Sequence, residues 1–158
     1  MQTLPLQWRL ATPADHDLLA GMMQAFYAED QIVFESDAVR AGLRELLADQ
    51  RNGEALLWLD EQGNVAGYAV MAMGFSLEQG GAFALLDELY LGPALRGRGR
   101  GRLALAIIEE RARARGVRRM RLEVNHHNEL AKRLYLKSGY VDDCRDLLTL
   151  SLDHEALA

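Results

Sequence analysis

Apolar residues recur every three or four positions in four parts of the chain, and this spacing predicts helices. The first runs over residues 12–28, where a threonine and then a proline stand at the start as N-cap and first-turn residue. The second is centred on residues 43–47 and ends near a glycine at position 53. The third covers residues 103–115 and the fourth 129–138, and each is followed by a glycine that ends it.

Shorter apolar runs between these helices predict strands. Two of them, separated by the turn-forming residues 61–64, predict a hairpin. The order is one strand, two helices, a run of antiparallel strands, and then strand, helix, strand, helix, strand, which predicts a mixed α/β domain without internal repeats. The predicted strands are residues 8–11, 55–59, 65–75, 83–91, 120–124 and 147–152.

The length and composition indicate one soluble globular domain over residues 1–158. Apolar residues make up 49% and charged residues 26% of the chain. The longest apolar run, residues 65–75, is far shorter than the roughly 20 residues that span a bilayer. The first residues lack the basic head and apolar run of a signal peptide, so we expect a cytoplasmic protein without a membrane partner. A single cysteine, Cys144, excludes an internal disulfide and a multi-cysteine zinc site, and we expect no metal.

Charge is strongly segregated along the chain. Residues 96–137 hold 13 of the 18 lysines and arginines and four of the 23 acids, so this stretch carries +9 and the remainder −14. A basic segment inside an acidic protein favours a locally held phosphate-bearing ligand over nucleic acid, whose binders are usually basic overall. For the arginines between residues 111 and 119, stabilisation of a helix C-terminus is an equally good interpretation.

The densest group of glycines and arginines lies between the strand 83–91 and the following helix. Glycines at alternate positions allow positive φ angles, so that several backbone N–H groups can converge on one anion. The helix N-terminus adds free N–H groups and the positive end of its dipole. We therefore predict a pyrophosphate site, with two or three of the arginines facing the phosphates, at Arg96, Gly97, Arg98, Gly99, Arg100, Gly101 and Arg102.

A glycine-rich turn allows three other interpretations. A Walker P-loop requires a lysine and a hydroxyl residue after the glycines, and the sequence has neither. A dinucleotide fingerprint fits Gly99-x-Gly101-x-x-Ala104 with Glu123 downstream, although seven residues separate the strand from Gly99 and the chain is short for two such halves. A purely structural loop with solvated arginines is the third.

Two motifs in this order resemble those of the GNAT superfamily of N-acetyltransferases. Arg96-x-x-Gly99-x-Gly101 is similar to the family's acetyl-CoA pyrophosphate motif, [QR]-x-x-G-x-[GA]. About 30 residues later, the chain resembles the family signature N-x-x-A-x-x-L-Y-x-x-x-G-[FY], with Asn128, Ala131, Leu134, Tyr135, Gly139 and Tyr140 at its fixed positions. The resemblance is close over residues 83–152.

The resemblance implies a GNAT-like α/β fold. Its central sheet would be mostly antiparallel and twisted, with six or seven strands, about four flanking helices and a splayed parallel strand pair that holds the cofactor. Residues 1–80 would form the acceptor-side half and residues 81–152 the acetyl-CoA-binding half.

The resemblance also assigns roles to residues. Backbone groups of Leu89, Tyr90 and Leu91 would face the pantetheine arm and the thioester carbonyl, and Asn128 would bond the pantetheine amides or cap the helix that follows. Tyr135 would place its hydroxyl near the sulfur as general acid. The turn 96–102 would hold the pyrophosphate.

For the general base, the candidate is Glu88, because some family members carry a catalytic glutamate on that strand. Strand alternation would place it on the same side as Tyr90 and opposite Asp87 and Leu89. A polar residue on a solvated face, or a binder of a cationic acceptor, are the alternatives. By analogy with the family, the acceptor side would include Tyr27, Glu29, Phe75 and Glu88.

These inferences predict an enzyme that transfers an acetyl group from acetyl-CoA to a primary amine by direct attack. The partner would be a small-molecule or peptide amine, cationic in view of the −14 outside the basic stretch. The family also contains homodimers. Two alternatives stay open: a catalytically silent acetyl-CoA sensor of the same fold, and, more distantly, a dinucleotide-binding oxidoreductase.

Overall fold

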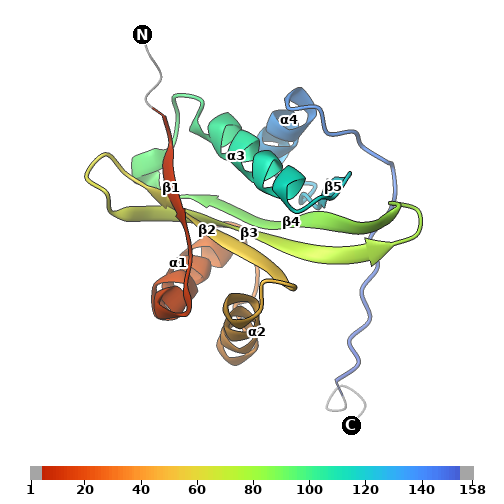
Figure 1. Cartoon of the computed structure of the whole chain (residues 1–158), viewed down its shortest axis with the longest axis horizontal. Helices are drawn as coiled ribbons and strands as arrows, with labels where there is room; N and C mark the ends of the chain where they lie inside the picture. The colour runs from red at the N-terminus through yellow and green to blue at the C-terminus, as the bar shows by residue number, and fades with distance from the viewer. Residues whose placement is uncertain (1–4, 154–158) are drawn as a thin grey trace.

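The computed structural model describes residues 5–153 (Figure 1). Short 3-10 turns at Pro13–Asp15 and Pro93–Leu95 precede the first and third helices. The elements are, in order, β1 (Gln7–Leu10), α1 (His16–Glu29), α2 (Ser36–Ala48), β2 (Gly53–Leu59), β3 (Val65–Ser76), β4 (Gly81–Leu91), α3 (Arg100–Ala114), β5 (Met120–Leu122) and α4 (Glu129–Lys137).

The strands of the described residues form one five-stranded sheet in the order β1-β2-β3-β4-β5. Neighbours from β1 to β4 are antiparallel, and β4 and β5 are parallel. This parallel pair is short, because Ala84–Leu86 is matched with Met120–Leu122 and no further pairing follows. The expected mixed α/β fold with one parallel pair is confirmed.

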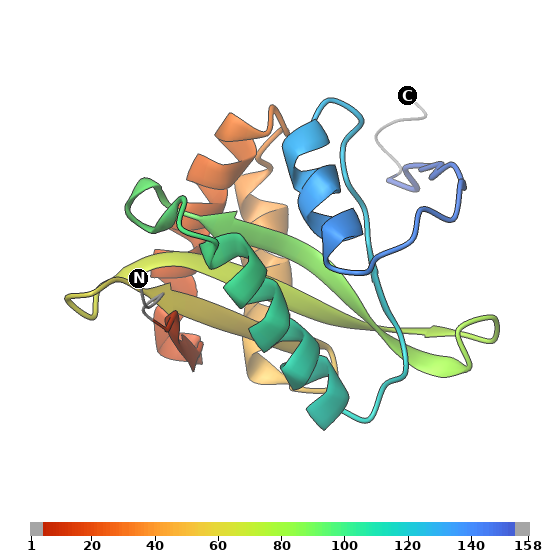
Figure 2. The same cartoon turned by 90° about the horizontal axis from the view of Figure 1, so that it is seen from above.

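Helices cover both faces of the sheet. In Figure 1, α3 and α4 lie on one face and α1 and α2 on the other, and Figure 2 shows α3 and α4 on the same side from above. Each layer has its own core. Trp58, Met71 and Leu86 pack beneath α3 and α4, whereas Tyr68 and Tyr90 pack with α1 and α2. The sheet is buried between two apolar layers, which explains the nearly continuous apolar runs of β2 and β3.

The start of the first helix follows the sequence prediction. The Asp15 carboxylate accepts a hydrogen bond from the Thr12 N–H at 2.8 Å, so the first turn is capped as the residue order indicated. Arg9 on β1 donates two hydrogen bonds to the same carboxylate, at 2.9 and 2.8 Å. These bonds lower the pKa of Asp15 to about 2, and they join the first strand to the first helix.

A β-bulge interrupts β4 at Asp87. Val70 of β3 is opposite Glu88 and Met71 is opposite Leu86, so Asp87 has no counterpart. Before the bulge Leu86 faces α3, and after it Leu89 does, so the alternation of β4 shifts by one residue. The expected side of Glu88 and Tyr90, opposite Leu89, is confirmed, but regular alternation does not extend through Asp87.

The predicted strand at residues 147–152 is wrong, and the sheet has five described strands in place of six or seven. Residues 141–153 have no regular structure, and Leu148 is 90% exposed. A strand needs a backbone partner, and the neighbouring β5 is only three residues long. The segment is held elsewhere by two ion pairs, Arg145–Glu78 at 2.7 Å and Lys132–Asp142 at 2.8 Å.

A buried ion pair connects β2 to α3. The Glu54 carboxylate is 9% exposed and receives two hydrogen bonds from Arg111, at 2.6 and 2.8 Å. We expect Glu54→Gln to lower the free energy of unfolding by about 2 kcal/mol, because the substitution leaves a partly buried guanidinium without its counter-charge. Urea denaturation measures this value. Glu110→Gln, which removes an exposed pair with Arg113, is the control and should change it by less than about 0.5 kcal/mol.

None of the helices in the described residues is long and apolar enough to cross a membrane.

Candidate active site

A large cleft opens where β4 and β5 separate. Beyond Leu86 and Leu122 the two strands no longer pair, and the cleft extends from this gap beneath α4. Its volume is about 1610 Å³. Its walls come from the end of α1, β4, β5, α4 and residues 141–148, so both halves of the chain contribute to it.

The glycine–arginine turn forms a nest of backbone donors beside this gap. Gly97, Arg98 and Gly99 have φ angles of 81°, 55° and 70°, three successive residues in the left-handed region. Such a sequence of conformations turns neighbouring N–H groups toward one point. Within the described residues, five N–H groups of the turn make no hydrogen bond: those of Gly97, Arg98, Gly99, Gly101 and Arg102. This arrangement suits an anion with several oxygens.

The helix that follows completes the nest. Gly99 is the N-cap of α3, a helix of 15 residues, so the first-turn N–H groups and the positive end of the helix dipole lie at the turn. A Cβ at Gly101 would come within 3.1 Å of the Leu134 side chain, so glycine lets α3 approach α4 closely. A Cβ at Gly97 or Gly99 would meet open space. The residues present therefore fit a pyrophosphate.

Three arginines of the turn lie beside acidic side chains. Arg96 forms an ion pair with Glu29 at 2.7 Å and donates to the Leu91 carbonyl at 2.9 Å. Arg98 and Arg100 lie 3.9 and 3.5 Å from Glu61 in the β2–β3 turn. Acids lie beside three of the four guanidiniums, whereas five backbone N–H groups of the turn have no hydrogen-bond partner among the described residues, so the backbone groups are the first candidates for binding an anion. That two or three arginines face the phosphates stays a prediction.

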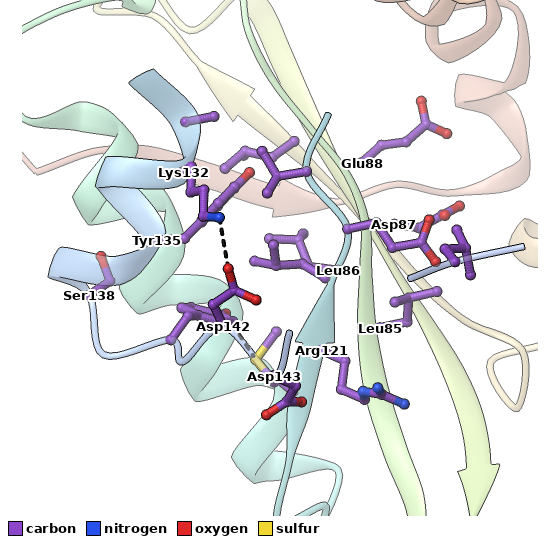
Figure 3. Close-up of a pocket in the computed structure, with 18 of the residues that line it drawn as sticks. Leu85, Leu86, Asp87, Glu88, Arg121, Lys132, Tyr135, Ser138, Asp142 and Asp143 are labelled. Atoms are coloured by element: carbon purple, nitrogen blue, oxygen red, sulfur yellow. Dashed lines mark hydrogen bonds and ion pairs between the residues drawn. The ribbon is translucent and has the colours of Figure 1, made fainter. Parts of the chain in front are cut away.

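Two residues of the second motif lie on α4. The Asn128 side chain caps this helix, accepting from the Ala131 N–H at 3.2 Å, which is one of the two roles expected for it. Tyr135 lines the cleft and packs on the core beneath α3, with its ring 5.8 Å from that of Tyr140. Figure 3 shows it facing Leu86 across the cleft. Burial, and secondarily the charge of Asp30, raises the pKa of Tyr135, which keeps its hydroxyl protonated.

Glu88 lies on β4 just beyond the last residue that pairs with β5, where β4 is still paired with β3. It receives hydrogen bonds from two tyrosines, Tyr68 at 2.7 Å and Tyr27 at 3.2 Å. Burial raises the pKa of Glu88, the hydrogen bond from Tyr68 opposes this, and the charge of Asp87 adds to the increase. Burial also raises the pKa of Asp87, which lies in the same cleft. A carboxylate with a raised pKa in a cleft is suited to accept a proton near neutral pH.

Tyr135 and Glu88 approach the gap from opposite faces of the sheet. Tyr135 packs with the core beneath α3, whereas the partners of Glu88 belong to the core beneath α1. In Figure 3, the Glu88 side chain points away from Tyr135, beyond β4. Because β4 and β5 are separated here, a molecule placed in the gap could contact both side chains.

The chain matches the profile of the "Acetyltransferase (GNAT) family" over residues 19–140. It belongs to this family. The resemblance derived from the two motifs is therefore confirmed, and the match extends well into the first 80 residues. The dinucleotide alternative is excluded, because a GNAT sheet with a single parallel pair is not a doubly wound parallel sheet.

Solved structures share the GNAT fold along nearly the whole chain. An integron cassette protein from the mobile metagenome of Cole Harbour Salt Marsh is 28% identical, with a TM-score of 0.79 over 93% of this chain and 91% of that one. Two others are below 25% identity and show the fold alone. A predicted acetyltransferase from Clostridium acetobutylicum, with acetyl-CoA, is 19% identical, with a TM-score of 0.78 over 93% and 96% of the chains. The ribosomal-protein-alanine N-acetyltransferase of Brucella melitensis is 20% identical, with a TM-score of 0.70 over 92% and 99%. A search of curated proteins found no match to this sequence.

Of the residues expected to line the acceptor side of this GNAT protein, Tyr27 lies beside Glu88 and Phe75 does not. Tyr27 contacts Glu88, and Glu29 contacts Arg96. Phe75 lies outside the site, because it is five residues along β3 from the position opposite Glu88, roughly 17 Å in an extended strand, and is 77% exposed.

Two contacts of this GNAT site were missed by sequence reasoning. One is the hydrogen bond from Tyr68, which sits in an apolar run and carries no local signal. The other joins Asp30 at the end of α1 to Asn125 before α4, at 3.2 Å. The described residues contain no cluster of three potential metal ligands.

Proposed function

We propose that this GNAT protein transfers the acetyl group of acetyl-CoA to a primary amine by direct attack in a ternary complex. The observation that carries the proposal is a backbone nest suited to a pyrophosphate in the turn after β4, together with Glu88, a carboxylate of raised pKa on β4 itself that lines the cleft. Family membership supports the transfer of an acetyl group.

The turn and the end of β4 would hold the cofactor. Backbone N–H groups between Gly97 and Arg102 would bind the pyrophosphate, and the backbone of Leu89–Leu91, on the edge of β4 that β5 no longer pairs with, would face the pantetheine arm. When bound, acetyl-CoA supplies an activated acetyl thioester. The role of the chain is to orient that group in the gap, where an amine can reach it.

Glu88 would act as general base. An alkyl ammonium has a pKa of about 10.4, so deprotonating it at pH 7 costs about 4.6 kcal/mol. Glu88 would accept the ammonium proton, directly or through one water, so that the neutral amine can attack the thioester carbon. The C–S bond then breaks, and the second nitrogen proton is balanced by the proton that the departing thiolate takes up. The hydrogen bond from Tyr68 keeps an oxygen of Glu88 fixed while Glu88 accepts its proton.

The acceptor would be a cationic amine. Asp87 and Glu88 line the same cleft, and Asp30 lines it from the end of α1. These acids favour an ammonium group and disfavour an anion near the reacting nitrogen. Polyamines, amino-sugars and basic amino acids or peptide termini fit this description.

Tyr135 would protonate the departing thiolate. A thiol has a pKa of about 8.5, so its thiolate leaves readily without a full proton transfer. We expect Tyr135→Phe to lower kcat about tenfold and to leave acetyl-CoA affinity within twofold. Steady-state kinetics and calorimetry measure the two values. An unchanged kcat would show that this hydroxyl takes no part in the reaction.

The test of the whole proposal is acetyl-CoA-dependent thiol release against a panel of polyamines, amino acids, amino-sugars, and lysine and N-terminal peptides, with a blank that lacks acceptor. Turnover on one class, and a mass increase of one acetyl group on that amine, would support the proposal. Tight acetyl-CoA binding with no turnover on any amine would instead support the silent sensor.

A further inference from the structure

The two tyrosines that bind Glu88 occupy different positions. Tyr27 lines the cleft, as Glu88 does, and donates to Oε2. Tyr68 is not among the residues that line the cleft. It donates to Oε1 from β3, inside the protein, and is 0% exposed. One hydroxyl can therefore meet a substrate, and the other is enclosed by the protein.

Tyr68 is held rigidly by the sheet and by α1. On β3 it lies opposite Tyr90 and diagonally across from Glu88, on the same face of the sheet. The rings of Phe26 and Tyr90 lie 6.3 and 5.8 Å from its own. A side chain packed in this way has one rotamer, so the direction of its hydroxyl is fixed before a substrate arrives.

We infer that Tyr68 is a positioning residue of the acceptor site, which fixes the orientation of the Glu88 carboxylate and stabilises its charged form from the enclosed side. This inference rests on the proposed role of Glu88 as base. The bulge at Asp87 makes the contact possible, because it sets the alternation that places Glu88 and Tyr68 on one face.

The groups around Glu88 indicate in which direction loss of the Tyr68 hydroxyl would shift the pKa of Glu88. The groups that face Glu88 are Tyr27 from α1, Tyr68 from β3 and Asp87 from β4. Among the described residues, none of the ion pairs gives this carboxylate a lysine or arginine partner. Burial and Asp87 favour the protonated acid, and the two hydroxyls favour the carboxylate. Removing the shorter hydrogen bond therefore leaves Glu88 protonated at higher pH.

We expect Tyr68→Phe to move the acidic midpoint of kcat/KM upward by about one pH unit and to lower kcat about tenfold, with acetyl-CoA affinity unchanged. Tyr27→Phe should instead raise KM for the amine more than it lowers kcat, because Tyr27 faces the substrate. Tyr68→3-fluorotyrosine, a stronger donor of nearly the same shape, should move the midpoint downward. This second variant retains the buried hydroxyl if Tyr68→Phe folds poorly.

A direct titration separates this inference from the proposed function. Carboxyl ¹³C NMR follows Glu88, with Glu88→Gln assigning its signal, and Tyr68→Phe should raise the titration midpoint whether or not Glu88 is the base. Tyr140→Phe, which removes a hydroxyl that makes no bond to Glu88, is the control and should leave it unchanged. A shifted NMR midpoint with an unshifted kcat/KM profile would support the Tyr68 contact and contradict the base role. An unshifted NMR midpoint in Tyr68→Phe would overturn the inference.

Discussion

Replacing Glu88 by glutamine is expected to lower kcat/KM at neutral pH about 1000-fold and to abolish its acidic limb. Glutamine retains an oxygen that can accept from Tyr68 or Tyr27, so the packing between α1 and β3 is kept while proton acceptance is lost. A positioned general base typically contributes 10² to 10⁴ in rate, which sets the size of this effect.

The pH dependence of kcat/KM follows from the direction in which the pKa of Glu88 is shifted. Burial raises the pKa of Glu88, so in the wild-type protein kcat/KM should fall as the pH decreases through a midpoint above that of an ordinary glutamate. A pH profile of kcat/KM for the best amine of the panel measures this. Asp49→Asn, which removes an exposed ion pair with Arg51 away from the cleft, is the control and should retain the wild-type profile. If Glu88→Gln also retains it, the proton goes to an ordered water or another residue.

Replacing Gly99 by aspartate is expected to weaken acetyl-CoA binding roughly 1000-fold. The new carboxylate would stand at the N-cap of α3, where the pyrophosphate is expected. Two like charges about 4 Å apart repel by about 4 kcal/mol at an effective dielectric constant of 20, which corresponds to this factor. Aspartate tolerates positive φ better than most residues, so the turn should keep its shape at φ 70°. Calorimetry with acetyl-CoA measures the affinity.

The hairpin between β3 and β4 offers a matched control. Gly80 also has a positive φ, 83°, and open space where a Cβ would be, so Gly80→Asp introduces the same charge with the same backbone demand away from the turn. It should leave acetyl-CoA affinity unchanged. If Gly99→Asp behaves in the same way, the glycine–arginine turn is not the pyrophosphate site.

Local sequence signals predicted most of the fold. The threonine and proline before α1, the apolar spacing within the helices and the glycines that follow α3 and α4 all act over one or two turns, and the structure confirms each. The strand predicted at residues 147–152 is not formed, because a strand depends on a distant partner and not only on its own residues. Its leucines favour an extended chain, but a strand exists only where a neighbour offers backbone groups, and no local pattern states whether one does.

In the candidate site, too, local features could be predicted from the sequence and long-range contacts could not. Backbone conformation at Gly97 and Gly99 depends on the residue type itself, so the nest could be predicted from the sequence. The partners of the arginines could not, because Arg96 meets Glu29, a residue 67 positions away, and this contact exists only after α1 packs on the sheet. Charge along the chain drew attention to the arginines of the turn, and only the structure shows that three of them lie beside acids.

The sequence by itself determined the family, the order of the elements, the glycine turn and the candidate residues Glu88 and Tyr135, because each is encoded in residue types at short and fixed spacing. Only the tertiary structure decided how these residues are used. The bulge at Asp87 depends on the register between β3 and β4, and the hydrogen bonds of Glu88 reach 20 positions to Tyr68 and 61 positions to Tyr27. Contacts over such separations arise from the packing of whole layers, and that packing sets the chemistry of the site.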